Sequence, residues 1–326
     1  MQRHTVLDTE TWYRHAFLNR LQSFLLIGVM AAFLGATGWL LWGPDGVTAL
    51  LLAGVVLIFL NPVASPKLVM RLYHARRLEP TQAPALYAAL EELARRAGLP
   101  TTPTLYHLPS AMVNAFAVGT RRHAAIAVTD GLLRQLELRE VMGVLAHEIS
   151  HIRNNDMWVM GLADMFSRLT STLSLFGQIL LILNLPLIMA TGAGISWSAI
   201  LLLVFAPTLS ALAQLGLSRT REFDADLNAV RLTGDPEGLA RALAKIEQIQ
   251  SSMLEHIFLP GRGIPEPSLL RTHPPTEERI RRLLELRRPP SADSLRLALP
   301  QEKMLPSGLA APVTRRPGWH VNGLWH

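Results

Sequence analysis

The sequence predicts a mostly helical membrane protein with one small β-sheet, and three observations lead to this fold class. Of the 326 residues, 49% are apolar, and they gather in long runs instead of spreading evenly along the chain. Three charge-free stretches, residues 21–44, 46–66 and 169–218, are long enough to form membrane-spanning helices, the last of them two. Short β-prone runs fall together between residues 104 and 129. We therefore expect four transmembrane helices that carry a helical, water-exposed domain with a small sheet.

Each half of the membrane part is expected to form a helical hairpin. The first hairpin covers residues 21–66 and turns at residues 43–46. Its first apolar run is too long for a removable signal peptide and lacks a small-residue cleavage site. The second hairpin covers residues 169–218 and turns near residues 191–194. A buried helix pair of a soluble core explains this segment less well, because fifty consecutive residues carry no charge.

Charged residues indicate the orientation of the chain and exclude some classes of partner. Lysine and arginine flank the outer ends of both hairpins, so residues 1–20, 67–168 and 219–288 are expected in the cytoplasm. The net charge of +6 is explained by these basic residues beside the apolar segments. No nucleic-acid-binding motif is found in the sequence. The chain has no cysteine, which excludes disulfides and thiolate metal ligands. Residues 289–326 are proline-rich and are predicted to form a tail.

Within the cytoplasmic part, local patterns predict helices and a small group of strands. The first helix covers residues 84–97 and ends before Gly98. Strands are expected at residues 104–108, 115–118 and 124–129. A second helix begins near Glu140, and its expected continuation from His151 to about Leu169 would span roughly 27 Å. A further helix start is indicated near residue 276.

The second helix carries the pattern His-Glu-Ile-Ser-His at residues 147–151. Because residues i and i+4 project from one face of a helix, His147 and His151 can reach the same zinc ion. Glu148 lies beside them without being a ligand, and its carboxylate can serve as the general base in peptide hydrolysis. The alternative is a helix that carries these three residues by chance. Apolar residues at helical spacing and the absence of a helix breaker favour the metal site.

A catalytic zinc site normally has three protein ligands, so a third ligand is expected elsewhere in the chain. The best candidate is Glu222, which lies one helical turn before Asp226. Asp226 can accept the spare N–H of a ligand histidine and so fix the orientation of its ring. On its own, this segment is more simply a solvated acidic helix start balanced by arginines. Beside two histidines at helical spacing, the metal site is favoured.

Four stretches of the chain occur in the order typical of one protease family. They are H-E-I-S-H at 147–151, R-E-F-D-A-D at 221–226, N-A-F-A-V-G at 114–119 and T-H-P-P-T-E-E-R at 272–279. Over about residues 20–285 the chain resembles the HtpX-type integral-membrane zinc metalloproteases, which are gluzincins related to the CAAX prenyl endopeptidases. The resemblance implies a zincin-like cytoplasmic protease domain with one Zn²⁺ per chain. It makes His147, His151 and Glu222 the zinc ligands and Glu148 the catalytic base.

The resemblance also implies roles for residues around the metal. Asn114, Ala115 and Phe116 would line a sheet edge to which an extended peptide adds as a strand. His273 would act on the oxyanion, and Asp156 would accept a hydrogen bond near the ligands. The residues alone leave other interpretations open: a turn residue for Asn114, a core side chain for Phe116, a helix-entry position for His273 and a solvated position for Asp156.

The function implied by the resemblance is quality control of misfolded or damaged membrane proteins under stress. The protease would work in a bacterial inner membrane, facing the cytoplasm, alongside an ATP-dependent membrane protease. The predicted nearness of the metal to the bilayer indicates membrane proteins or their juxtamembrane loops as substrates. Two alternatives remain: a prenyl-peptide endoprotease with the same metal site, and a non-catalytic membrane scaffold with a structural zinc.

Overall fold

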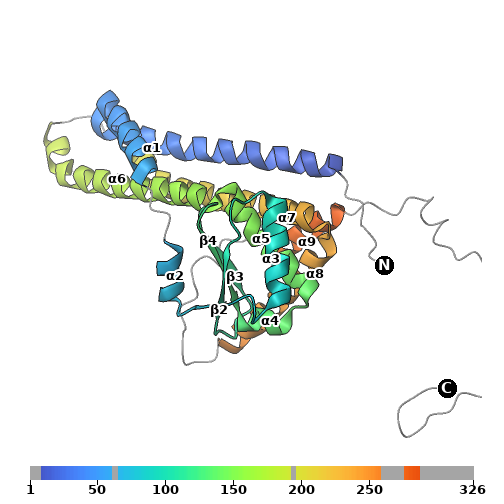
Figure 1. The fold of residues 1–326 in the computed structure, drawn as a ribbon. Helices are drawn as coiled ribbons and strands as arrows, with labels where there is room; N and C mark the ends of the chain where they lie inside the picture. The colour runs from blue at the N-terminus through green and yellow to red at the C-terminus, as the bar shows by residue number, and fades with distance from the viewer. Residues whose placement is uncertain (1–8, 61–64, 192–195, 258–274, 287–326) are drawn as a thin grey trace, which may run out of the picture. The chain divides into compact units, whose positions relative to one another are not determined.

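The computed structural model describes residues 9–60, 65–191, 196–257 and 275–286. The described part is mostly helical with one four-stranded sheet, as the sequence predicts (Figure 1). Long apolar helices form one group of elements, and shorter helices around the sheet form the other. The expected turn near residues 191–194 and the expected tail at 289–326 lie wholly or mostly outside the described residues.

Three helices are long and apolar enough to cross a membrane: α1 (Thr9–Leu60), α6 (Asp156–Thr191) and α7 (Trp197–Thr233). α1 contains the first expected turn, because Gly43 adopts a left-handed φ of 64° and the chain folds back there. Leu50 consequently lies against Gly38. The chain is a multi-pass membrane protein with three candidate spanning helices among the described residues, where the sequence predicts four spans.

The expected domain boundaries near residues 168 and 219 fall inside continuous helices. α6 runs through Arg168 and α7 runs through Arg219 without interruption. With 36 and 37 residues, each helix is about 55 Å long, whereas the hydrocarbon core of a bilayer is only about 30 Å thick. The charged end of α7, residues 219–233, therefore extends beyond the hydrocarbon core.

The long helices combine close contacts with exposed apolar faces. A Cβ atom at Gly177 of α6 would lie 2.6 Å from Leu203 Cδ2 of α7, so these two helices are in close contact there. Large apolar side chains are exposed on the outer faces, among them Phe24, Leu25, Ile182, Leu183 and Phe205. Such exposure suits side chains that face lipid rather than water.

The helix that carries the two histidines, α5 (Leu138–Asn154), is shorter than the sequence predicts. Asn155 adopts the left-handed conformation, with φ of 55°, and closes α5 before α6 begins at Asp156. The expected continuation of the ligand helix from His151 to about Leu169 is therefore wrong. The distance of roughly 27 Å derived from a continuous helix does not apply.

The sheet contains the three predicted strands and one short strand. Its order is β1 (Arg76–Arg77), β2 (Thr104–Leu108), β4 (Ala124–Thr129) and β3 (Ala115–Gly119). β4 pairs in parallel with β2 and antiparallel with β3, so β3 lies at an edge of the sheet. One face of the sheet packs on α3 (Pro84–Ala97) and α5, and the other packs on Met70 of α2 (Pro66–Leu72).

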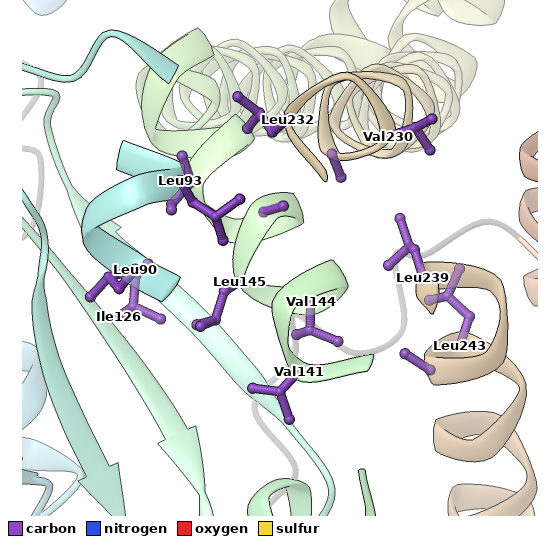
Figure 2. Close-up of a cluster of buried hydrophobic side chains, with 14 of the residues drawn as sticks. Leu90, Leu93, Ile126, Val141, Val144, Leu145, Val230, Leu232, Leu239 and Leu243 are labelled. Carbon is purple, nitrogen blue, oxygen red and sulfur yellow. The ribbon is translucent and has the colours of Figure 1, made fainter. Parts of the chain in front are cut away.

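The main core joins the sheet to several helices, chiefly α3, α5, α7 and α8 (Pro236–Ile257). Figure 2 shows Leu90, Leu93, Leu145 and Ile126 on one side of this cluster, with Leu239 of α8 across from α5. At Gly143 a Cβ atom would lie 3.0 Å from Leu239 Cα, so α5 and α8 are in close contact. α4 (Asp130–Gln135) follows β4, and α9 (Thr276–Glu285) starts at the predicted position.

Candidate metal centre

α5 places its two histidines on one face and packs an apolar face into the core. Its first turn is fixed by Glu140, whose carboxylate accepts the backbone N–H of the residue three positions earlier at 2.9 Å. Leu145 and Ile149 are fully buried in the main cluster. Because of the i, i+4 spacing, His147 and His151 both project toward α7.

Glu222 of α7 lies opposite the two imidazoles. Their Nε2 atoms are 3.1 Å apart, and the Glu222 carboxylate oxygens lie 3.4 Å from Nε2 of His147 and 3.6 Å from Nε2 of His151. Tetrahedral zinc with bonds of about 2.0–2.1 Å places its ligand atoms about 3.3 Å from one another. The donors at His147, His151 and Glu222 therefore fit a single zinc ion.

His147 is oriented by Asp226, which is itself held by a buried arginine. Nδ1 of His147 lies 2.9 Å from Asp226 Oδ1. Arg279 of α9 donates to both oxygens of that carboxylate, with N–O distances of 2.7 Å, and lies 3.3 Å from Glu222 Oε2. Asp226 thus stands where the sequence places it, beside the outer nitrogen of a candidate ligand.

His151 has a separate partner at the start of α6. Its Nδ1 lies 2.8 Å from Asp156 Oδ2, and Asp156 is buried. The left-handed turn at Asn155 brings this carboxylate back toward the histidine five residues earlier. Arg221 of α7 lies 3.2 Å from the other oxygen of Asp156. The solvated alternative for Asp156 does not describe this buried side chain.

The electrostatics of the site favour a cation between the imidazoles. Burial lowers the pKa of His147, but hydrogen bonds to Asp226 and Glu222 outweigh it and raise the pKa to about 10. Burial also lowers the pKa of His151, but the hydrogen bond to Asp156 and the negative charges of Glu222 and Asp156 together raise this pKa above 6.5. A divalent cation takes the place of protons on such ligands, so metal binding here is coupled to proton release.

Glu148 lies beside the donor group without belonging to it. Its side chain is half-buried, and it follows His147 directly on α5. Burial lowers the pKa of Arg279, but the nearby carboxylates of Asp226, Glu222 and Glu148 raise it above its ordinary value. The carboxylate of Glu148 therefore shares the electrostatic environment of the site. Among the described residues, the group of donors that could hold a metal ion does not include Glu148.

The three candidate substrate residues lie at the start of the edge strand β3. The backbone of Asn114 is bonded to Thr129: its N–H donates to Thr129 Oγ1 at 3.0 Å, and its carbonyl accepts from the same hydroxyl at 2.9 Å. Ala115 packs on the main core beside α5, whereas the ring of Phe116 lies 5.3 Å from that of Tyr73 on the other face of the sheet. The side chain of Phe116 thus lies on the sheet face opposite the one that packs on α5.

His273 lies outside the described residues. Sequence reasoning gave no role to two charged residues that the structure places at the site, Arg221 and Arg279. Arg279 belongs to the quoted T-H-P-P-T-E-E-R stretch, which was the one signal for it. Arg221 precedes Glu222 directly, and its position in the sequence indicates only a countercharge for the acidic residues. Neither arginine could be paired with its carboxylate from spacing alone, because each contact joins residues more than 50 positions apart.

Comparisons with known proteins agree on one family. A family model described as Peptidase family M48 matches residues 80–287. The chain is 38% identical over 286 residues to "Protease HtpX homolog" of Acaryochloris marina, which covers 82% of this chain and 95% of that protein. It is 36% identical over 277 residues to "Protease HtpX homolog" of Thermococcus kodakarensis, with the same coverage of both chains.

The chain also aligns with a solved structure, the crystal structure of S. mikatae Ste24p. It aligns with 20% identity and a TM-score of 0.44, covering 83% of this chain and 66% of that one. A TM-score of this size does not establish a shared fold. The sequence matches, together with the His-His-Glu cluster, show that the chain belongs to peptidase family M48 and is a zinc metallopeptidase homologous to the HtpX proteases.

Proposed function

We propose that the chain is a membrane-bound endopeptidase with one Zn²⁺ held by His147, His151 and Glu222. The observation that supports this most directly is the convergence of these three donors at the spacing of a zinc site, with Glu148 beside them. Zinc supplies Lewis-acid chemistry and lowers the pKa of water to about 7. Glu148 accepts a proton from the attacking water and delivers it to the leaving amine.

The neighbouring residues prepare the site for this reaction. Asp226 and Asp156 accept the Nδ1 protons of the two histidines, which leaves both Nε2 atoms as metal donors. Arg279 balances the buried negative charge of Asp226 and Glu222. His273 remains a candidate for stabilising the oxyanion, as the family resemblance implies.

The substrate is proposed to bind as an additional strand along β3. This strand is an edge of the sheet, and its face with Ala115 and Ala117 packs toward α5. Main-chain hydrogen bonds at an edge accept many sequences, which suits a protease that acts on damaged proteins. In this proposal the Asn114 side chain and those backbone groups of Ala115 and Phe116 that face away from β4 contact the peptide, because both backbone groups of Asn114 are bonded to Thr129.

The metal centre is proposed to lie close to the bilayer surface. The charge-free part of α7 ends at Ser218, and Glu222 follows it four residues later, a rise of about 6 Å. A site at this height favours membrane proteins and their juxtamembrane loops over freely soluble chains. We propose four transmembrane segments, with residues 67–168 and 219–288 on the cytoplasmic side of a bacterial inner membrane.

The proposed biological role is quality control of misfolded or damaged membrane proteins during stress. It is supported by the similarity to HtpX homologues and by a sheet edge suited to sequence-tolerant binding. An ATP-dependent membrane protease is the proposed functional partner, and nucleic acid is not a proposed partner. No described feature favours the prenyl-peptide endoprotease over this role.

The substitution Glu148→Gln tests the catalytic assignment. Purified full-length protein in lipid nanodiscs should lose at least about 100-fold in cleavage of a casein-type substrate, because the general base is gone. Zinc per chain should stay unchanged, since Glu148 is not a ligand. His147→Ala is the matched comparison and should lose both zinc and cleavage. Cleavage that survives Glu148→Gln would refute the proposed base.

A further inference from the structure

A line of buried and partly buried polar groups connects the metal site with the first membrane helix. Starting from His151, it passes through Asp156 of α6 at 2.8 Å and Arg221 of α7 at 3.2 Å. Arg221 then donates from Nη2 to Ser23 Oγ of α1 at 2.7 Å. Four helices, α5, α6, α7 and α1, therefore contribute one group each to a continuous chain.

The donors and acceptors of this chain are arranged in one direction. Ser23 donates its hydroxyl proton to the carbonyl of Asn19 on its own helix at 2.8 Å, so its oxygen is left to accept from Arg221. Arg221 can only donate, and the carboxylate of Asp156 can only accept. His151 must then carry its proton on Nδ1, which leaves Nε2 with a lone pair for the metal.

Burial makes these partners necessary rather than incidental. Ser23 and Asp156 are each 2% exposed, and the Arg221 side chain is 14% exposed. A buried carboxylate or guanidinium without a partner is costly, so each group holds its neighbour in place. α1 adds a second buried contact nearby, because Asn19 Nδ2 donates to Asp224 Oδ1 at 3.3 Å.

The two histidines are supported in the same chemical way but from different parts of the protein. His147 contacts Asp226, which is bound by Arg279 from α9 in the region after the membrane helices. His151 contacts Asp156, which is bound by Arg221, and this arginine is in turn bound by Ser23 of α1. One ligand therefore depends on the soluble part, and the other depends on a helix of the membrane part.

We propose that Arg221 and Ser23 are positioning residues for the metal ligand His151, so that α1 forms part of the active-site support. The inference rests on the metal centre proposed above and concerns how His151 is held. Its consequence is that zinc retention depends on the packing of α1 against α7. Displacement of α1 would loosen His151 while leaving His147 and its partners in place.

The test is zinc affinity of the full-length protein in nanodiscs, measured by competition with a chelator. Ser23→Ala should weaken zinc binding about 3- to 10-fold, as expected for one lost hydrogen bond to a charged group. Asp156→Asn should weaken it about 10- to 100-fold, because it removes the direct partner of a ligand. Arg221→Lys keeps the charge but offers a single donor nitrogen, so it should weaken binding to an intermediate degree.

The matched control is Thr37→Val on the same helix. Thr37 is buried and donates to the carbonyl of Phe33 on its own helix, as Ser23 does to Asn19, but it lies away from Arg221. This variant should keep the zinc affinity of the unmodified chain. In the Asp156→Asn background, Ser23→Ala should add less than twofold, because the path to His151 is already interrupted.

Three results would overturn the inference. Zinc affinity within twofold of the unmodified chain in both Ser23→Ala and Arg221→Lys would show that α1 does not support His151. An equal loss in Thr37→Val would assign the effect to general helix packing. If the unmodified chain binds no zinc, the proposed metal centre itself fails, which separates this outcome from the first two.

Discussion

At the scale of single residues, the site is defined by buried ion pairs between one arginine and two carboxylates. Arg279 is 5% exposed and contacts Asp226 with two donors, while a third nitrogen lies near Glu222. Two carboxylates and one guanidinium thus surround His147 away from water. Removing the guanidinium would leave the Asp226 carboxylate buried without its cation, which is the costly way to break such a cluster.

Arg279→Gln should therefore lower zinc affinity by about 10- to 100-fold, because Asp226 loses the group that fixes it beside His147. Chelator competition on the full-length protein measures this change. Arg281→Gln is the control on the same helix, since Arg281 is exposed and pairs only with Glu285 four residues later among the described contacts. An equal effect of both substitutions would contradict the specific role of Arg279.

At the scale of elements, the contacts between helices determine where the ligands meet. α5 is held at its first turn by an ion pair with the segment between α7 and α8, in which Arg139 Nη2 lies 2.7 Å from Asp235 Oδ1. This contact joins α5 to the segment that directly follows α7. It is partly exposed, with 48% of the Arg139 side chain accessible, so its contribution is at most about 1 kcal/mol.

The acid stability of the protein should depend on this ion pair. Burial raises the pKa of Asp235, but the hydrogen bonds from Arg139 and from the backbone of Gly238, together with the nearby positive charges, outweigh burial, so the pKa lies below the ordinary 3.8. A carboxyl with a lowered pKa stabilises the fold above 3.8, and this contribution is lost as the pH falls through the folded-state pKa.

Asp235→Asn should therefore lower the melting temperature at pH 7 and show a smaller further loss below pH 4 than the unmodified chain. Thermal unfolding in detergent across pH 3–7 measures both. Asp164→Asn, which removes an exposed pair with Arg168 within α6, is the control and should change the profile less. Parallel profiles for the Asp235→Asn variant and the unmodified chain would refute the linkage.

The elements that could be predicted from sequence are those with strong local patterns. The helix at residues 84–97, the three main strands and the start of α9 are confirmed, because apolar spacing and glycine or proline punctuation are local signals. The break at Asn155 was missed, since an asparagine in a left-handed conformation leaves no pattern that outweighs a helical run. The two-residue strand β1 is likewise too short to carry a periodic signal.

The candidate site could be predicted in part for the same reason. The i, i+4 spacing of the two histidines, and of Glu222 and Asp226, is visible in the sequence, and the structure brings all four together. The contact of Ser23 with Arg221 joins positions 198 residues apart. No local pattern reports such a contact, which arises only when α1 packs along α7.

At the scale of the whole molecule, the central feature is that one helix serves both the membrane and the metal site. α7 is a single helix from Trp197 to Thr233, apolar in its first part and carrying Glu222 in its charged part. The ligand set is therefore complete only when the membrane helices and the α5 segment are packed together. This explains how a membrane segment between two ligands is compatible with one metal site.

X-ray absorption at the zinc edge, on the full-length protein in nanodiscs, tests this account most directly. The account predicts a first shell of two imidazole nitrogens and oxygen donors at about 2.0–2.2 Å, without sulfur. It also predicts that Glu222→Ala removes an oxygen donor and lowers zinc per chain, whereas Glu148→Gln leaves the spectrum unchanged. An unchanged shell and full zinc in Glu222→Ala would contradict it.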